Sequence, residues 1–169
     1  MGYLCWHTAG ETRDAAAEVS SAEQRQADQQ AASAAGSAFL ATMFTVDSTS
    51  MAKWDSAVLS ATTDGMHAQL GQWRAVLEKL VGAHTEMTSK VLDVGVLTQS
   101  DTAMTLLAVI ESTGRSDPSA TPTTNQSAAI VDLTKVGDRW KVERYGPAGG
   151  ADQPAPNPVA PQPPPPPPR

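Results

Sequence analysis

Two aspartates are the best candidates for catalytic chemistry in this sequence. Asp93 and Asp132 each lie within a stretch where apolar and polar residues alternate, as they do in a β-strand. A strand carboxylate that faces a concave, desolvated cavity can act as a general base. On the outer face of a half-buried sheet the same carboxylate is merely solvated. We expect the second arrangement, because no His or Tyr follows either aspartate in alternation. We therefore predict no catalytic residue and no enzymatic activity.

The other residues that could carry chemistry are isolated from one another. His7, His67 and His84 do not form a pair with metal-ligand spacing, and the position of His84 is typical of a helix boundary. The single cysteine, Cys5, excludes a disulfide within the chain. The sequence also contains no glycine-rich phosphate-binding loop. We predict no cofactor and no bound metal.

Length and charge set limits on the class of protein. A chain of 169 residues suits one ordinary domain with tails. A formal net charge of −6 argues against nucleic-acid binding, which requires clustered lysine and arginine. Residues 31–46 carry no charge, but the stretch is short for a membrane span and contains several serines and threonines. It is better interpreted as a buried core helix.

The N-terminal segment, residues 1–30, combines two patterns. Residues 1–6 are apolar and aromatic, and they change abruptly to polar residues, as at the end of a membrane helix with Tyr3 and Trp6 at the interface. Residues 11–30 are rich in Ala, Glu, Gln and Arg, and Val19 is their only sizeable apolar side chain. We interpret residues 1–30 as the end of a membrane anchor followed by a solvated spacer helix.

Three helical patterns are expected before any strand. A helix from Ala31 should bury small and apolar residues as far as Val46, and a short second helix should run from Met51 to about Leu59. The strongest amphipathic stripe begins at Met66 and ends at His84. We expect this third helix to lie across the concave side of a sheet, packing on it the apolar residues Leu70, Trp73, Leu77 and Val81.

Four strand patterns follow the helices, at residues 90–98, 102–112, 124–136 and 139–145. The last two form the clearest hairpin in the chain, joined by a two-residue turn at Gly137 and Asp138. Residues 114–122 contain Gly, Ser, Asp and two Pro, which indicates a loop. Helices followed by an antiparallel meander define an α+β fold. We place this domain at residues 31–146.

Residues 147–169 differ in composition from the rest of the chain. Eleven of the thirteen prolines lie here, ending in a run from Pro163 to Pro168. Such a segment forms extended polyproline II with a solvated backbone, so we expect a disordered tail. It could act as a semi-rigid spacer or as a docking site for a partner with an aromatic groove, and we favour the spacer.

The order of elements resembles the NTF2-like, or cystatin-like, cone. Within that superfamily the residues resemble the Mce-associated membrane proteins of mycobacteria and related actinobacteria, over residues 1–146. The resemblance depends on an aromatic-Thr-Val-Asp segment at residues 44–47, a Thr-Asp-Gly step at residues 63–65, and the closing hairpin DLTKVGDRWKV at residues 132–142.

The resemblance implies a non-enzymatic accessory protein of the cell envelope. Such a protein has a single N-terminal membrane helix, mostly absent from this sequence, and a domain on the extracytoplasmic side. Its partners would be Mce transporters, which import lipids or sterols, and other envelope proteins; a bound lipid is also compatible. Two alternatives stay open. One is an NTF2-like isomerase or dehydratase with Asp93 or Asp132 as base. The other is a scaffold in a secretion-type envelope complex, similar to periplasmic domains of type IV secretion assembly proteins.

Overall fold

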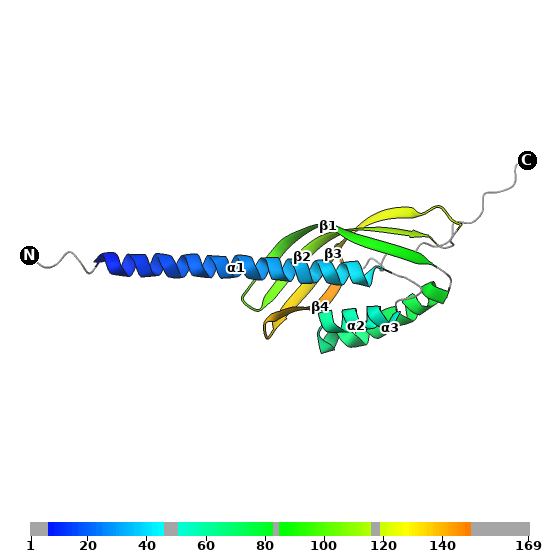
Figure 1. The fold of residues 1–169 in the computed structure, drawn as a ribbon, viewed down its shortest axis with the longest axis horizontal. Coiled ribbons are helices and arrows are strands. Elements are labelled where there is room, and N and C mark those ends of the chain that lie inside the picture. The colour runs from blue at the N-terminus through cyan, green and yellow to red at the C-terminus, as the bar shows by residue number, and fades with distance from the viewer. Residues whose placement is uncertain (1–6, 46–50, 83–84, 116–118, 150–169) are drawn as a thin grey trace, which may run out of the picture.

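The computed structural model describes residues 7–45, 51–82, 85–115 and 119–149. Three helices precede four strands, so the predicted α+β order is confirmed (Figure 1). The elements are α1 (His7–Met43), α2 (Met51–Ala61), α3 (Asp64–Gly82), β1 (Glu86–Gln99), β2 (Ala103–Arg115), β3 (Thr123–Val136) and β4 (Arg139–Pro147). The predicted anchor fragment at residues 1–6 and most of the predicted tail, residues 150–169, lie outside the described residues.

The strands form one antiparallel sheet in the order β1-β2-β3-β4, which is the predicted meander. Gly137, with a φ of 61°, and Asp138 make the predicted turn between β3 and β4. Strands β1 and β2 are longer than predicted: β1 begins at Glu86, and β2 continues to Arg115, inside the predicted loop. The apolar periodicity ended before the backbone pairing did, because Glu86 and Arg115 are paired polar residues at the end of the ladder.

The two faces of the sheet differ in burial. On the inner face of β2, Met104, Leu106, Ala108 and Ile110 are buried, and the residues between them are partly exposed. Three of their partners on β3, Ala129, Val131 and Leu133, are buried as well. The run that the sequence presented as continuously apolar therefore belongs to a sheet with one covered face.

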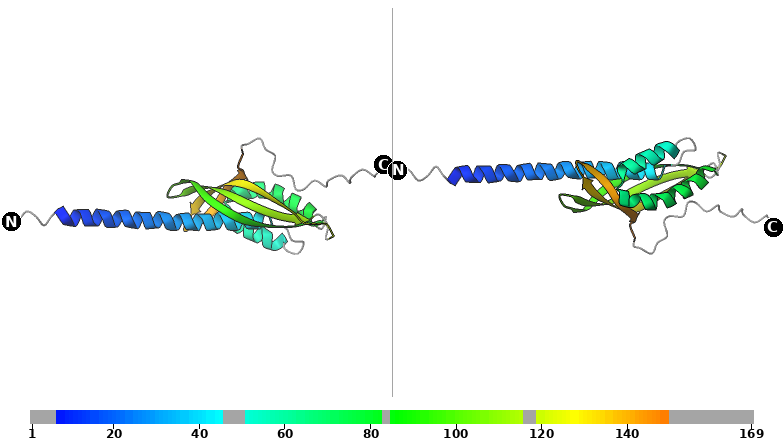
Figure 2. Two further views of the ribbon diagram at one scale, coloured as in Figure 1. Left: turned by 90° about the horizontal axis from the view of Figure 1, so that it is seen from above. Right: turned by 90° about the horizontal axis from the view of Figure 1, so that it is seen from below.

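Helix α1 covers the inner face, which corrects the prediction that α3 would do so. The C-terminal half of α1 crosses in front of the strands, while its N-terminal half projects beyond the sheet (Figures 1 and 2). Its buried residues are Ala32, Gly36, Phe39, Leu40 and Met43. A Cβ atom on Gly36 would lie only 2.9 Å from Cδ1 of Leu106. The absence of a side chain at this position lets the helix approach β2 closely.

The buried face of α1 is also rotated from the predicted one. Ala31 and Ala38 were expected on that face but are exposed, whereas Ala32 and Leu40 are buried. Val46, the expected end of the stripe, lies outside the described residues. From residue 18 to residue 30 nearly every side chain is exposed. No helix within the described ranges is both long and apolar enough to span a bilayer.

Helices α2 and α3 pack beside β4 rather than across the sheet. Their connection is fixed to that strand, because the backbone N–H of Thr63 donates to the carbonyl oxygen of Val142 at 3.0 Å. Of the predicted α3 stripe, Leu70 and Leu77 are buried, but Trp73 and Val81 are only partly buried. The amphipathic pattern correctly identified a packed helix but not the surface on which it packs.

Both edges of the sheet are partly covered. Along β1, the Ser89 hydroxyl donates to the carbonyl oxygen of Ala41 at 3.1 Å, and Gln99 Nε2 donates to that of Arg25 at 2.9 Å. Helix α1 therefore lies against this edge as well as across the inner face. At β4, Thr62 forms a bridge with Val142. Where an edge is covered, pairing with a strand of another chain is disfavoured.

Candidate functional site on the outer face of the sheet

The first candidate base, Asp93, lies on the outer face of β1 and is exposed. One of its carboxylate oxygens, Oδ1, accepts a hydrogen bond from the backbone N–H of Val94 at 2.9 Å. The residue stands where the register of β1 against β2 shifts, between Val91 and Asp93. An exposed carboxylate that accepts a hydrogen bond from the next residue's backbone N–H lacks the desolvation that a general base requires.

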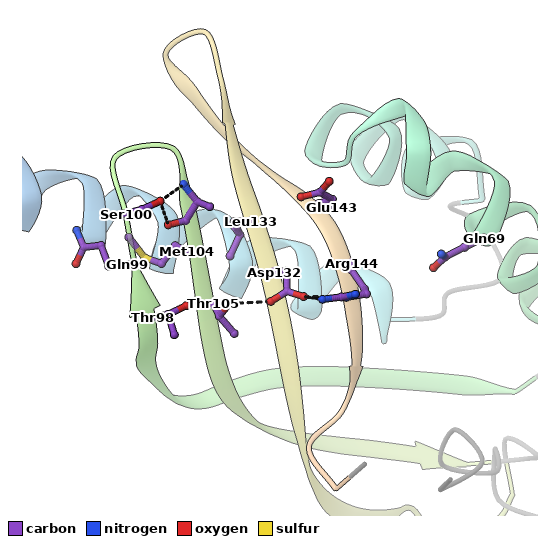
Figure 3. A pocket seen from close by; sticks show the side chains of 11 residues that line it. Gln69, Thr98, Gln99, Ser100, Met104, Thr105, Asp132, Leu133, Glu143 and Arg144 are labelled. Carbon is purple, nitrogen blue, oxygen red and sulfur yellow. Dashed lines mark hydrogen bonds and ion pairs between the residues drawn. The ribbon is translucent and has the colours of Figure 1, made fainter. Parts of the chain in front are cut away.

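The second candidate base, Asp132, lies on the outer face of the central strand β3. Its Oδ1 accepts from the Thr105 hydroxyl at 2.8 Å, and its Oδ2 accepts from Arg144 Nε at 2.8 Å and lies 2.7 Å from Arg144 Nη2 (Figure 3). Both carboxylate oxygens of Asp132 are therefore occupied by hydrogen bonds. This geometry makes Asp132 a structural ion-pair partner rather than a free base.

Asp132 and Arg144 also line an open surface cavity of about 490 Å³. Figure 3 shows Thr98 and Thr105 on the side of β1 and β2, Glu143 on β4, and Gln69 across from them on α3. The polar side chains of this cavity come from four strands and one helix. The hydrogen bonds between side chains of this cavity join Asp132 to Thr105 and to Arg144.

Four aromatic side chains pack together in the interior of the domain. Tyr145 lies against the rings of Phe39, Phe44 and Trp73, with centroids 5.5, 6.3 and 6.4 Å away. Burial raises the pKa of the Tyr145 phenol far above its usual range, and Trp73 offsets this only in part. A phenol that stays protonated among packed rings is a core residue, not an acid or base poised for neutral pH.

Apolar side chains gather on the outer face of the two central strands. Leu107 of β2 pairs with Ile130 of β3, and the same row ends in Gly95 on β1 and Gly146 on β4. A Cβ atom at either glycine would have no neighbour within 4 Å, so the row is open at both ends. In the adjoining row Val109 pairs with Ala128. We call Leu107, Val109, Ala128 and Ile130 the outer apolar strip.

Paired charges border the outer apolar strip on both sides. On one side Lys90 Nζ lies 2.6 Å from Glu111 Oε1, and Gln126 donates to the same carboxylate. The hydrogen bond from Lys90, and after it that from Gln126, lowers the pKa of Glu111. On the other side is the pair of Asp132 and Arg144. An apolar centre with a polar rim is the usual anatomy of a protein-binding surface.

The strip was not among the predicted functional residues. The nearly continuous apolar run at residues 102–112 was interpreted as a central strand. The available signal was the pair of glycines, Gly95 and Gly146, at positions that alternation assigns to the same face. Glycine in a strand often marks a place where something approaches the backbone closely.

Comparisons with known proteins identify the fold. No protein-family model matches the chain, and no curated protein is significantly similar to it. Among solved structures it is similar to a periplasmic fragment of TraM, with a TM-score of 0.58 and 13% identity, over 69% of this chain and 94% of that one. CagV, a VirB8 homolog of the type IV secretion system of Helicobacter pylori, gives a TM-score of 0.57 and 10% identity, over 68% and 93%.

An IcmL-like type IV secretion system protein of Legionella pneumophila is similar to the same extent, with a TM-score of 0.55 and 8% identity over 72% of this chain and 94% of that one. At such identities the likeness establishes the fold alone. The predicted architecture of helices packed on a four-stranded antiparallel sheet is thereby confirmed.

Proposed function

We propose that this domain is a non-catalytic scaffold of a secretion-type protein complex in the cell envelope, and that it binds a partner through the outer apolar strip. The observation that carries the proposal is the fold match itself. Three solved domains share this fold over nearly their whole length, and each is named as a periplasmic fragment or as a protein of a type IV secretion system. Fold alone does not imply function, so the proposal also needs a surface.

The outer apolar strip supplies that surface. Leu107 and Ile130 are only half-buried and stand outside the core cluster, although they lie at the centre of the sheet. Their burial against a partner would be favourable at about 25 cal/mol per Å² of apolar area. The bordering ion pairs would give the contact its orientation.

The lack of catalysis is part of the proposal. Asp93 is exposed and accepts from the backbone N–H of Val94, and both carboxylate oxygens of Asp132 are engaged by Thr105 and Arg144. These contacts weigh against an isomerase or dehydratase with either aspartate as base. They leave binding as the activity that the site supports best.

An extracytoplasmic location also belongs to the proposal. The projecting part of α1 is polar and solvent-exposed from residue 18 onward, which suits a spacer between a membrane and the domain. The anchor expected at residues 1–6 lies outside the described residues. The chain would then resemble the TraM fragment in standing on the periplasmic side of a membrane.

The particular complex is a separate question. An Mce transporter for lipids or sterols is one candidate, supported by the residues of the closing hairpin at 132–142 and by no comparison. A secretion-type complex is the better supported candidate, because two of the three similar folds belong to proteins that are named as type IV secretion components. Identification of the co-purified proteins separates the two.

The test is co-purification of the membrane-anchored, full-length protein from its native envelope. Leu107→Lys and Ile130→Lys place a charge in the strip, and Thr124→Lys places the same charge on an exposed polar position of the same face. We expect the first two variants to lose the partner by at least tenfold and the third to retain it. Circular dichroism confirms that each variant is folded.

Two results would overturn the proposal. One is that the strip variants hold the partner as tightly as the parent. The other is that Asp132→Asn abolishes the cellular function while the protein stays folded and in its complex, which would return catalysis to Asp132. Asp93→Asn is the matched control for the loss of a single outer-face carboxylate.

A further inference from the structure

Helix α1 is a continuous helix of 37 residues that packs on the sheet over only part of its length. It is fixed to the sheet from Arg25, whose carbonyl oxygen accepts from Gln99 Nε2 at 2.9 Å, to Met43, which is buried in the core. The part before Arg25 projects beyond the sheet (Figures 1 and 2). Because the helix is continuous, the projecting part extends the axis of the packed part.

Polar contacts hold α1 on both sides where it leaves the sheet. On the side of β3, Lys135 Nζ lies 2.7 Å from Asp28 Oδ1, and the two side chains are only 23% and 16% exposed. The same ammonium lies 5.7 Å from the centre of the Trp140 ring on β4. On the side of β1, Gln99 donates to the backbone of Arg25. Contacts to both halves of the sheet restrain the helix against swinging about the point at which it leaves.

The packed part of α1 also fixes the direction in which the outer apolar strip faces. Gly36 packs on Leu106 of β2, and the next residue, Leu107, points to the opposite face of the strand. The strip therefore lies on the far side of the sheet from α1, level with Gly36. Because α1 lies along the inner face from Arg25 to Met43, the outer face looks sideways from the helix axis.

The length of α1 sets the distance between its N-terminal end and the strip. From His7 to Gly36, at the rise of an α-helix, the distance along the axis is about 44 Å. The projecting part is rich in Ala, Glu, Gln and Arg, which favour a helix in water. A solvated helix of this composition is a semi-rigid spacer, so the distance is held rather than averaged.

We propose that α1 is a rigid stalk that presents the outer apolar strip sideways at a fixed height above a membrane, and that the partner at the strip is a protein anchored in the same membrane. This inference rests on the proposed function, in which the strip binds a partner and the N-terminal end of α1 is held at a membrane. A membrane helix is tilted on average by about 20° from the bilayer normal, so a stalk that continues it turns the strip toward proteins standing beside it. Such a neighbour meets the strip only at one height, whereas a soluble partner would bind at any height.

The first test changes the height of the strip without altering the strip. Three Glu-Ala-Ala-Ala-Lys repeats, inserted after the exposed Ser20, lengthen α1 by about 22 Å as a stiff helix. Three Gly-Gly-Gly-Gly-Ser repeats at the same place add as many residues as flexible coil. We expect the helical insertion to lower co-purification of the partner with the membrane-anchored, full-length protein at least tenfold, because a rigid tether of the wrong length removes the effective concentration. The flexible insertion should retain the partner, because the domain can return to the partner's level.

The second test measures the stiffness of the stalk in solution, on the full chain. Spin labels are placed at Glu18→Cys, on the projecting part, and at Thr124→Cys, on the sheet, in a chain that carries Cys5→Ser so that no other thiol is labelled. Double electron–electron resonance then reports the distribution of distances between the two labels. We expect one narrow distribution.

The contacts at the exit point should set the width of that distribution. Asp28→Ala combined with Gln99→Ala removes contacts on both sides of α1, and it should widen the distribution. Glu23→Ala, an exposed carboxylate on the same helix, is the control and should leave the width unchanged. Melting curves confirm that the domain of each variant is folded.

Three outcomes would overturn the proposal. They are a broad distribution in the parent, equal widths for the double variant and Glu23→Ala, and equal recovery of the partner with the helical and the flexible insertions. Equal and undiminished recovery is the result that a soluble partner would give. If Leu107→Lys loses the partner while both insertions keep it, the stalk proposal fails and the strip proposal stands. If Leu107→Lys keeps the partner, the strip proposal itself fails.

Discussion

At the scale of single residues, Gly137 has a backbone conformation that other residues resist. Its φ of 61° lies in the left-handed region, and a Cβ atom there would meet no neighbour within 4 Å. We expect Gly137→Val to destabilise the domain by about 1–2 kcal/mol through the backbone alone. The melting temperature should fall by about 2–8 °C. The melting temperature of Gly137→Asn should fall less, because asparagine tolerates a positive φ. Equal melting temperatures for Gly137→Val and the parent would contradict the turn.

A second residue-scale prediction concerns pH and the pair of Asp28 with Lys135. The Lys135 ammonium lies 2.7 Å from Asp28 Oδ1, and this hydrogen bond lowers the pKa of Asp28 below its ordinary 3.8. A lowered folded-state pKa contributes stability above the unfolded pKa, and that contribution is lost as the pH falls through the folded value.

We therefore expect Asp28→Asn to have a lower melting temperature than the parent at pH 7. The difference between the two melting temperatures should disappear as the pH falls below 3.8. Glu18→Gln, on the exposed part of α1, should show no gap at any pH. Melting curves recorded from pH 7 to pH 2 measure both. A gap for Asp28→Asn that persisted unchanged at pH 2 would show that the pair is not its source.

At the scale of elements, the strands were predictable and the choice of covering helix was not. Alternation located β1, β3 and β4, because only one face of each packs on the core, and a nearly continuous apolar run located β2. Helix α3 has the larger apolar residues, and these made its stripe the stronger one. The face of α1 contains Ala32 and Gly36, whose small size is what permits close contact with β2. The apolar periodicity of a helix indicates how much apolar surface the helix can bury. It does not indicate how closely the helix backbone can approach the sheet.

The close contact of α1 predicts opposite effects for one substitution at two helical glycines. Alanine is preferred to glycine inside a helix by about 0.5–1 kcal/mol. Gly71→Ala should raise the free energy of unfolding by this amount in a urea melt, because a Cβ atom at Gly71 would meet no neighbour within 4 Å. Gly36→Ala should not show this gain in stability, because the new Cβ atom would lie only 2.9 Å from Cδ1 of Leu106. Gly36→Val should lower the free energy of unfolding by about 1–3 kcal/mol. Equal gains at both glycines would mean that α1 does not seat on β2 as described.

At the scale of the whole molecule, burial explains why the candidate surface escaped prediction. A sequence pattern indicates which residues are apolar, but the strip around Leu107 and Ile130 matters because nothing in the core packs on it. Asp93 and Asp132 were easier to identify as candidates, because a carboxylate is recognisable in the sequence without knowledge of its surroundings. In the structure both carboxylates form hydrogen bonds with neighbouring residues.

The last prediction concerns the boundary between the domain and its proline-rich tail. The ladder of β4 extends to Pro147, and the backbone N–H of Ala148 donates to the carbonyl oxygen of Ala128 at 2.9 Å. Removal of residues 150–169 should leave the melting temperature unchanged, because a solvated spacer contributes no core contact. Removal of residues 146–169 also deletes the end of the ladder, and it should cost about 1–3 kcal/mol. If the shorter deletion alone lowered the melting temperature, the tail would have to contact the domain, and the spacer interpretation would be wrong.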